Sequence, residues 1–375
     1  MRRIKVYIHE HKDWTKFTWD NDLVLLKLGE ARNLQGRLMG KMESLGFELQ
    51  NEAVLNTLTL DVLKSFEIEG EHLEKAQVRS SVAKRLGMQI KGEVESERNL
   101  DATVEMMLDA TQRYELPLTK ERLFNWHSAL FPAGRSGMYK ITVGDWRTDS
   151  TGPMQVVSGA LGKEKIHFEA PNSDLVEGEM RHFLNWFENE NELDPVLKAA
   201  LAHLRFVTIH PFEDGNGRIT RALTDMLLAR SDKSVQRFYS MSTQIMAQRK
   251  EYYQILEQTQ KGKSNVTPWV IWFLQCLINA IKSTDEILSK TLYKAQFWKR
   301  HVDTTLNERQ RKILNLLLDD FEGKLTTSKW AKICKCSADT ALRDIQDLMK
   351  KEVLQKEASG GRSTNYELVQ LKTKG

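Results

Sequence analysis

The sequence predicts a mainly α-helical protein with a small β-hairpin and a C-terminal winged helix-turn-helix. Three observations lead to this fold class. Apolar residues recur at helical spacing through most of the first 298 residues, β-branched runs split by glycine and proline are confined to residues 139–171, and the pattern changes again near residue 303. We therefore expect an N-terminal helical region over 1–98, a helical core over 99–298 and a third domain over 303–375.

The bulk composition is that of an ordinary globular protein in a reducing compartment. Apolar residues make up 41% of the 375 residues and charged residues 28%, and the net charge of +4 gives no general attraction to nucleic acid. The three cysteines are odd in number and lack a CxxC spacing. Residues 1–14 contain no signal-peptide core, and the apolar run at 269–281 is too short to cross a bilayer. We expect a cytoplasmic protein with no membrane partner.

Helical periodicity accounts for most of the chain before residue 303. A first helix, "LVLLKLGEARNLQGRLMGKMESLG", is expected to end at Gly46, and a second ends at the stop residue Gly70. Residues 99–130 continue the helical pattern until a glycine- and proline-rich break. Short β-branched runs in 139–171 predict a hairpin, and helices resume over 174–298.

The tail shows three short helical patterns followed by two short strands. The helices are expected in "LNERQRKILNLLLDDF", "TTSKWAKICK" and "SADTALRDIQDLMKKEV", the last with Ser337 as its N-cap. The strands flank Gly360-Gly361-Arg362. This order resembles a winged helix-turn-helix module. Its basic residues alternate with acidic ones, whereas a DNA reader normally presents a cleaner basic face, so protein docking or dimerisation is favoured over DNA binding.

The stretch "HPFEDGNGRITR", residues 210–221, concentrates polar chemistry between two apolar helices. Gly215 and Gly217 come directly before the second helix, and a glycine loop entering a helix N-terminus is a ready anion site because its backbone N–H groups point outward. Arg218 and Arg221 fall in the first turn of that helix, where cations are unfavourable unless an anion lies between them. The pattern therefore indicates phosphate binding by an arginine pair.

A carboxylate and a histidine complete this stretch. Asp214 would repel phosphates unless a divalent ion such as Mg²⁺ bridges them, and His210 can take a proton near neutral pH. Together these groups predict transfer of a phosphate-containing group to a nucleophile. A calcium loop is excluded because its first and twelfth positions would be Phe212 and Leu223, and a dinucleotide fingerprint because no strand precedes the glycines. A structural turn with a core histidine is the remaining alternative.

These twelve residues resemble the signature of Fic proteins, His-Pro-Phe-x-(Asp/Glu)-Gly-Asn-Gly-Arg-x-x-Arg, with every fixed position matched. The resemblance implies a helical Fic core that transfers AMP from ATP to a hydroxyl of a target protein. It implies that His210 deprotonates this hydroxyl, that Asp214 holds Mg²⁺ or Mn²⁺, that the Gly-Asn-Gly turn cradles the α-phosphate and that the two arginines hold the β- and γ-phosphates. The implied nucleotide-binding residues in the motif are Phe212, Glu213, Asp214, Gly215, Asn216, Gly217, Arg218 and Arg221.

A second motif lies far upstream, in "SFEIEGE", residues 65–71. It matches the inhibitory motif of the family, (Ser/Thr)-x-x-x-Glu-(Gly/Asn), at Ser65, Glu69 and Gly70, and its position resembles the class with an N-terminal built-in inhibitor. The resemblance implies that Glu69 pairs with Arg221 and occupies the bidentate site that the γ-phosphate needs. Phe66, where relatives often have a second serine, departs from the pattern outside the required positions.

Two further parts of the site are implied by the resemblance. The hairpin would be the family's flap, which aligns a target segment by strand addition, and we place its target-binding residues at Met154, Gln155, Val156 and Val157. The stretch "RKEYYQIL" matches a tyrosine-bearing segment that lines the adenine pocket in relatives, so Tyr252 or Tyr253 is expected there. A tyrosine pair in a helix is equally compatible with a packed core.

Several functional alternatives stay open. Related folds transfer UMP, phosphocholine or a bare phosphate, and in some relatives the equivalent of Glu69 positions water for the reverse reaction, deAMPylation. A different class of function is a DNA-binding regulator whose core only senses nucleotide, but the intact His210 favours an enzyme because a sensor needs no base. Candidate partners are a target protein with a Ser, Thr or Tyr hydroxyl, the chain itself through self-modification, and a second copy in a homodimer.

Overall fold

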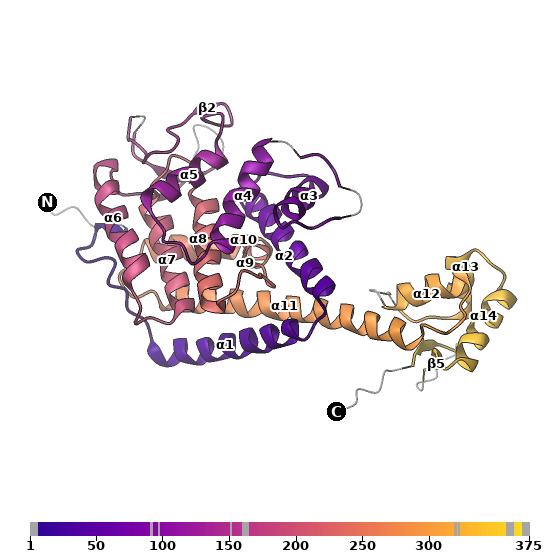
Figure 1. Ribbon diagram of the computed structural model, residues 1–375. Coiled ribbons are helices and arrows are strands. Elements are labelled where there is room, and N and C mark those ends of the chain that lie inside the picture. The colour runs from indigo at the N-terminus through magenta and orange to yellow at the C-terminus, as the bar shows by residue number, and fades with distance from the viewer. Residues whose placement is uncertain are drawn as a thin grey trace. The chain divides into compact units, whose positions relative to one another are not determined.

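The structure is a computed structural model that describes residues 7–90, 93–96, 98–150, 152–159, 165–318, 321, 323–357 and 364–369. Within these residues the chain consists of helices and three short antiparallel hairpins (Figure 1), so the predicted mainly α-helical fold class is confirmed. The chain divides into two compact units, Met1–Thr284 and Asp285–Gly375. No helix in the described ranges is long and apolar enough to cross a membrane.

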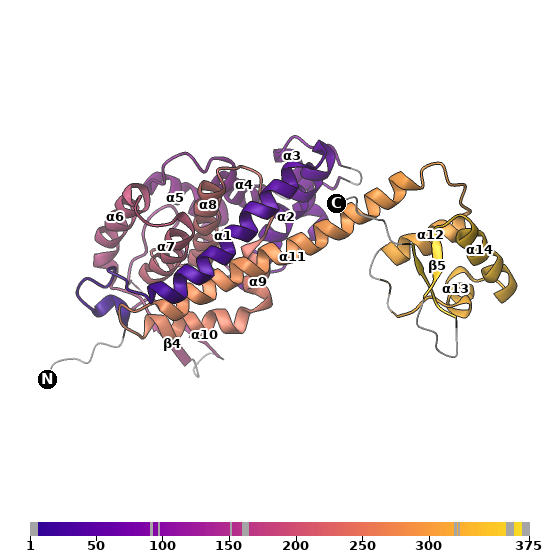
Figure 2. The ribbon, with the colours of Figure 1, turned by 90° about the horizontal axis from the view of Figure 1, so that it is seen from below.

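The first unit opens with helices that wrap around a buried pair. Its N-terminal elements are η1 (Ile8–Glu10), α1 (Asn21–Glu43), α2 (Phe47–Ile68) and α3 (Lys75–Arg85). α1 lies alongside the long helix α11 (Thr267–Arg300) in Figures 1 and 2, and a hydrogen bond from Lys27 Nζ to Gln275 Oε1 joins the two helices. α2 packs against α8 (Asn216–Asp232) and α9 (Met241–Ala247), so its C-terminal end reaches the 210–221 loop.

The element boundaries correct the sequence prediction at several points. The first helix ends at Glu43 and not at Gly46, because Gly46 is already the N-cap of α2. Gly70 is confirmed as a stop, with a φ of +86° that favours glycine. The segment 99–130 is two helices, α4 (Arg98–Gln112) and α5 (Lys120–Leu130), since Pro117 cannot continue a helix and Thr119 caps the next one. Helix α3 was not predicted.

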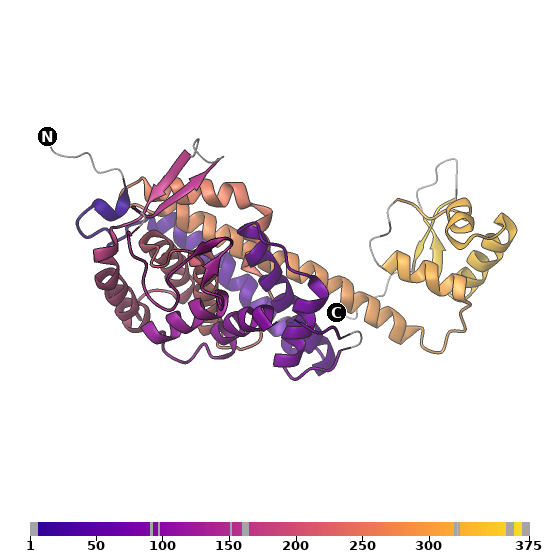
Figure 3. The ribbon, with the colours of Figure 1, turned by 90° about the horizontal axis from the view of Figure 1, so that it is seen from above.

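The region 135–169 contains two hairpins. β1 (Arg135–Ser136) pairs with β2 (Tyr139–Lys140), and this hairpin was not predicted. The predicted hairpin is confirmed as β3 (Gln155–Ser158) with β4 (Lys165–Glu169), and it carries a bulge between Val156 and Val157. Figure 3 shows its magenta strands beside α10 (Arg249–Gln260), where β4 contacts that helix.

The core of the first unit is the antiparallel pair α7 (Pro195–Ile209) and α8. Both helices are buried on nearly every side, and not along one stripe as their sequence pattern suggests. α6 (Ser173–Asn189), α4, α5 and α11 surround the pair (Figure 1). Because the 210–215 loop connects these two helices, its backbone is held at both ends by the best-packed part of the unit.

The second unit follows the predicted order of elements. It contains α12 (Glu308–Leu318), α13 (Thr327–Cys334), α14 (Ala338–Lys350), β5 (Leu354–Lys356) and β6 (Tyr366–Leu368). Ser337 is confirmed as the N-cap of α14, with its Oγ accepting from Thr340 N. Trp330, Ile345 and Leu348 are fully buried in its separate core. Gly360-Gly361-Arg362 lies outside the described residues.

Candidate functional site

The 210–215 loop has two left-handed residues that turn the chain from α7 into α8. His210, the C-cap of α7, has a φ of +52°, and Gly215, the N-cap of α8, has a φ of +83°. A Cβ on Gly215 would lie 2.8 Å from Phe131 Cε2, so glycine is needed here for space as well as for conformation. A non-glycine residue at positive φ, such as His210, is strained, and such strain is common at active sites.

Side chains predicted to bind nucleotide hold this loop closed. The Asn216 amide accepts from Phe212 N at 3.0 Å and donates to Phe212 O at 2.8 Å. The Phe212 ring stacks on His127 at 4.1 Å, and Glu213 accepts from both Thr142 N and Thr142 Oγ1. In this structure the side chains of Phe212, Glu213 and Asn216 are therefore engaged within the protein. Asn216 is the first residue of α8 and is buried.

His210 is held in one orientation and one tautomer. Its Nδ1 lies 3.2 Å from Val207 O, and because a carbonyl only accepts, the proton sits on Nδ1 and leaves the Nε2 lone pair available. Arg147 Nε donates to His210 O at 2.8 Å and Arg147 N donates to Pro211 O, which fixes the backbone from the other side. Burial lowers the pKa of His210 to about 4, so the imidazole is neutral at physiological pH.

Asp214 is the exposed carboxylate of the loop. Its side chain is 41% exposed, and it accepts hydrogen bonds from Gly215 N and Ser136 Oγ. Arg218 Nη2 lies 3.7 Å away. Among the described residues no group of three or more His, Cys, Asp or Glu side chains could hold a metal. A single exposed carboxylate does not form a protein cage, but it fits an Mg²⁺ ion that takes its other oxygens from phosphates and water.

Arg221 is buried and contacts the end of α2. Its Nε donates to Ser65 Oγ at 2.8 Å and its Nη2 donates to Ser65 O at 2.6 Å. Its Nη1 lies 2.9 Å from Glu69 Oε1, an ion pair in which the N–H is not aligned for a full hydrogen bond. Only 2% of the Arg221 side chain is exposed. Of the motif predicted to be inhibitory, Ser65 and Glu69 thus contact the arginine directly, and Gly70 lies just after the helix.

Glu69 lies over the N-terminal turn of α8. A Cβ on Gly217 would come 2.1 Å from Glu69 Oε1, so only glycine permits this approach. A helix N-terminus attracts anions through its unpaired N–H groups, and a carboxylate there takes the place that a phosphate would take. The end of α2 is in turn held by α10, because Arg249 Nε donates to Ile68 O at 2.7 Å.

Arg218 is also occupied, by residues that the sequence analysis did not assign. Its Nη1 lies 3.0 Å from Glu71 Oε1, and its guanidinium lies over the rings of Phe66 and Phe131, 5.1 and 4.9 Å from their centroids. Glu71 could have been singled out as the second acid of the Glu-Gly-Glu run. His127, Ser136 and Arg147 gave no comparable local signal, since each reaches the loop from a distant part of the chain.

The two tyrosines lie in different environments. Tyr252 is 2% exposed, and its hydroxyl is bonded to His203 Nε2 at 2.9 Å in the core, where it does not face a binding surface. Tyr253 is 37% exposed and reaches the end of α2, with its hydroxyl 3.4 Å from Ile68 O. The structure therefore favours Tyr253 over Tyr252 as a ligand contact.

The residues predicted to form the flap lie in the β3–β4 hairpin or directly before it. Gln155, Val156 and Val157 lie in β3, whereas Met154 precedes the strand and accepts from Ala170 N. The hairpin is tied to α10 through His167, whose Nδ1 is 2.7 Å from Glu257 Oε2. It is tied to the motif loop through Arg147, which also donates to Pro171 O.

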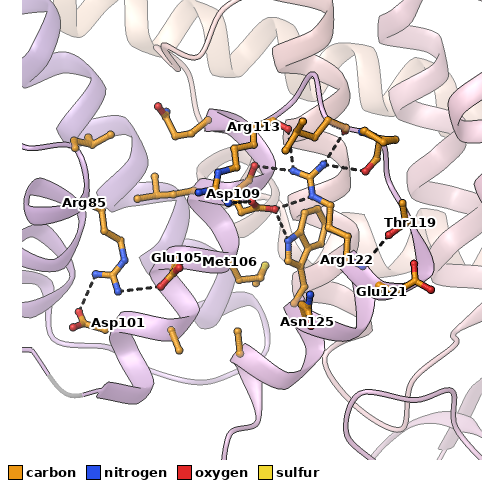
Figure 4. A pocket seen from close by; sticks show the side chains of 18 of the residues that line it. Arg85, Asp101, Glu105, Met106, Asp109, Arg113, Thr119, Glu121, Arg122 and Asn125 are labelled. Atoms are coloured by element: carbon orange, nitrogen blue, oxygen red, sulfur yellow. Dashed lines mark hydrogen bonds and ion pairs between the residues drawn. The ribbon is translucent and has the colours of Figure 1, made fainter.

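A large groove elsewhere on the first unit does not have the chemistry of this site. It has a volume of about 1040 Å³ and is lined by residues of α3, α4 and α5 and of the segment between α4 and α5, none of them from 210–221 (Figure 4). Its arginines Arg85, Arg113 and Arg122 each lie within ion-pair distance of a carboxylate. The arginines of the groove are thus already neutralised, and no helix N-terminal glycine loop enters it.

Comparison with known proteins gives two sequence matches along the chain. Residues 117–228 match the Fic/DOC family, and residues 7–88 match a domain of unknown function, DUF4172. "Protein adenylyltransferase Fic" of Drosophila mojavensis is 38% identical over 99 residues, which are 26% of this chain and 18% of that protein. "Protein adenylyltransferase fic-1" of Caenorhabditis elegans is 28% identical over 178 residues, 47% of this chain and 32% of that protein. The matches span less than a third of either relative.

The fold is shared with a solved structure. The crystal structure of a Fic family protein from Desulfovibrio desulfuricans G20 aligns with a TM-score of 0.52 at 20% sequence identity. The alignment covers 92% of this chain and 95% of that one. The likeness therefore extends well beyond the residues that match the family in sequence.

Proposed function

The chain carries a Fic/DOC domain, and on that premise we propose that it is a protein adenylyltransferase that transfers AMP from ATP to a hydroxyl side chain of a target protein. The observation that carries the proposal is His210, a neutral imidazole with an available Nε2, held beside the N-terminus of α8 and its arginine pair. A base next to a phosphate site is the minimum that phosphoryl-group transfer to a hydroxyl requires.

In the proposed reaction His210 Nε2 takes the proton of the target hydroxyl. The hydroxyl oxygen attacks the α-phosphorus of ATP, the bond from that phosphorus to the bridging oxygen of the β-phosphate breaks, and pyrophosphate leaves. The backbone at the start of α8 stabilises the charge on the α-phosphate, and Arg218 and Arg221 hold the β- and γ-phosphates. Asp214 would hold Mg²⁺ or Mn²⁺, which neutralises phosphate charge when bound.

We further propose that the arrangement described above is the resting state. Glu69 and Ser65 occupy the guanidinium of Arg221, and Glu69 covers the glycine turn at the start of α8. ATP then cannot place its terminal phosphate on Arg221 without displacing Glu69. A partly buried ion pair supported by hydrogen bonds is worth on the order of 2–3 kcal/mol. This free energy corresponds to a roughly hundredfold lower population of the state that can bind ATP for transfer.

The proposal extends to how the same site binds its target and how it removes AMP again. We propose that Gln155 to Val157 on β3 receive an extended target segment by strand addition, with Met154 at the base of the hairpin. Tyr253 is the proposed adenine contact, because it lies on α10 beside the end of α2. We propose deAMPylation as a possible reverse reaction of the same site, in which Glu69 orients the water that removes AMP.

The test compares three variants by transfer of α-phosphate-labelled ATP to lysate proteins. Glu69→Gly is expected to raise transfer strongly, and His210→Ala in the same background to abolish it. Glu67→Gln is the matched control, since Glu67 lies on the same helix but pairs with Lys64 at 2.6 Å. If Glu69→Gly leaves the transfer rate unchanged while the protein is folded and binds ATP, the resting-state proposal is wrong. Mass spectrometry of the labelled proteins identifies the target and distinguishes it from self-modification.

A further inference from the structure

The second arginine of the site is covered by its own set of contacts. Arg218 is 3% exposed, and its Nη1 is paired with Glu71 Oε1 at 3.0 Å. The ring of Phe66 lies near its guanidinium at 5.1 Å. Its Nε is buried and has no hydrogen-bond partner within the described ranges. Arg218 therefore makes its main polar contact, apart from Asp214 at 3.7 Å, with a carboxylate of the segment that follows α2.

Glu71 and Phe66 lie outside the inhibitory motif that the sequence shares with its family. The motif requires Ser65, Glu69 and Gly70, and all the contacts of Ser65 and Glu69 to the site described above are made to Arg221 or at Gly217. Phe66 is the position at which this chain departs from the serine of many relatives. In the structure the ring of Phe66 lies beside the guanidinium of Arg218. An aromatic ring attracts a cation through its π face, which a serine side chain does not have.

A guanidinium that is paired to a carboxylate has fewer donors left for phosphate. Arginine binds phosphate through parallel N–H donors, so a phosphate group must displace Glu71 to bind Arg218 in the same way. The α-phosphate does not depend on this displacement, because backbone N–H groups at the start of α8 suffice to receive it. The Glu71 carboxylate therefore affects only the phosphates beyond the first, whereas Glu69 pairs with Arg221 and also covers the turn at Gly217.

We propose that Glu71, with Phe66 beside it, is a selectivity residue that makes the resting site discriminate by phosphate number. Glu71 weakens the binding of di- and triphosphates at Arg218, independently of Glu69 at Arg221, and leaves nucleoside monophosphates unaffected. This inference rests on the proposed function, in which the two arginines hold the β- and γ-phosphates. It identifies AMP, the group transferred, as the nucleotide that the resting state admits most readily.

The test is calorimetric titration of the full chain with AMP, ADP and ATP in the presence of Mg²⁺. Glu71→Gln is expected to strengthen ADP and ATP binding about fivefold, since a half-exposed pair contributes roughly 1 kcal/mol, and to leave the AMP affinity unchanged. Phe66→Leu keeps an apolar side chain at this buried position and should shift ADP binding in the same direction by less. Glu67→Gln removes a charge from the same segment and should change nothing.

Two results would overturn the inference. Equal strengthening for AMP, ADP and ATP would show a general charge effect, and unchanged affinities for all three would show that Glu71 is a bystander. Glu69→Gly, titrated in parallel and assayed for AMP transfer, separates this inference from the proposed function. If Glu69→Gly binds ATP and transfers AMP while Glu71→Gln does not change ADP affinity, only the role of Glu71 fails. If no variant binds any nucleotide, the proposed function fails with it.

Discussion

At the scale of single residues, the site depends on which partner each charged or titratable side chain has. Arg221 donates to Ser65 and pairs with Glu69, and Arg218 pairs with Glu71. His127 donates its Nε2–H to Asp214 O, and burial lowers its pKa to about 4, so it supports the loop as a neutral donor. His210 also has a lowered pKa, but its Nε2 is not used in this network.

The pH dependence of AMP transfer tests the assignment of His210 as the base. Because burial lowers its pKa from 6.5 to about 4, the neutral form that accepts a proton persists to more acidic pH than an ordinary imidazole allows. We expect the rate of the Glu69→Gly variant to stay level as pH falls below 6.5 and to drop only as it nears 4. Circular dichroism at each pH separates this loss from acid unfolding. A midpoint near 6.5 would contradict the geometry described for His210.

At the scale of elements, α2 joins the site to the interior of the first unit. Its C-terminal end carries Ser65 and Glu69, and its middle carries Asp61, which is 3% exposed and accepts from Ser240 Oγ at 2.5 Å. Asp225 and Asp232 on α8 pair with Arg237 at 2.9 and 3.3 Å, and Asp61 is close enough to feel the charge of this arginine. Three buried carboxylates thus face one guanidinium, and a proton on Asp61 reduces their repulsion.

Replacing Asp61 by asparagine tests this network. Burial, and then the charge of Asp225, raise the pKa of Asp61 from 3.8 to about 8. Between these values the folded state holds a proton that the unfolded state releases, so this group lowers the free energy of unfolding as pH rises, by at most about 1.4 kcal/mol per pH unit. Asp61→Asn removes this pH dependence. In urea unfolding, the free energy of unfolding of the variant minus that of the unchanged chain should therefore increase from pH 5 to pH 8. A difference that does not vary with pH would contradict the protonation of Asp61.

At the scale of the whole molecule, the chain consists of two compact units with separate cores. The second unit packs Trp330, Ile345 and Leu348 in a cluster of its own. Two basic side chains near α14 pair with acids of that helix, Arg309 at 2.7 Å from Asp344 and Lys351 at 2.5 Å from Asp347. The preference for protein docking or dimerisation over DNA binding stays a prediction from the sequence.

Separate cores predict two unfolding transitions. Trp330 is completely buried in the second unit, and its replacement by alanine is expected to cost about 3–5 kcal/mol there. In scanning calorimetry only one of the two transitions should move to lower temperature. Trp269→Ala is the matched control, because Trp269 is equally buried in the first unit and should move the other transition. A single transition that both variants shift together would show that the units unfold as one.

The sequence by itself determined which polar groups gather in the 210–221 loop, and it determined most of the helices. The histidine, the acid, the glycine turn and the arginine pair lie within twelve residues, and helix periods and caps also arise from neighbours a few positions apart. The pairing of Glu69 with Arg221 was expected from the family resemblance alone, since the two residues are about 150 positions apart and no local spacing relates them.

Only the tertiary structure decided how distant segments meet at the site. It places Glu71 and Phe66 on Arg218, turns the side chain of Asn216 inward, buries Tyr252 and leaves Tyr253 beside the end of α2. The physical reason is that such contacts are set by the packing of helices against each other. A tyrosine or a glutamate has the same local pattern whether its neighbour from another helix is a core residue, an arginine or solvent.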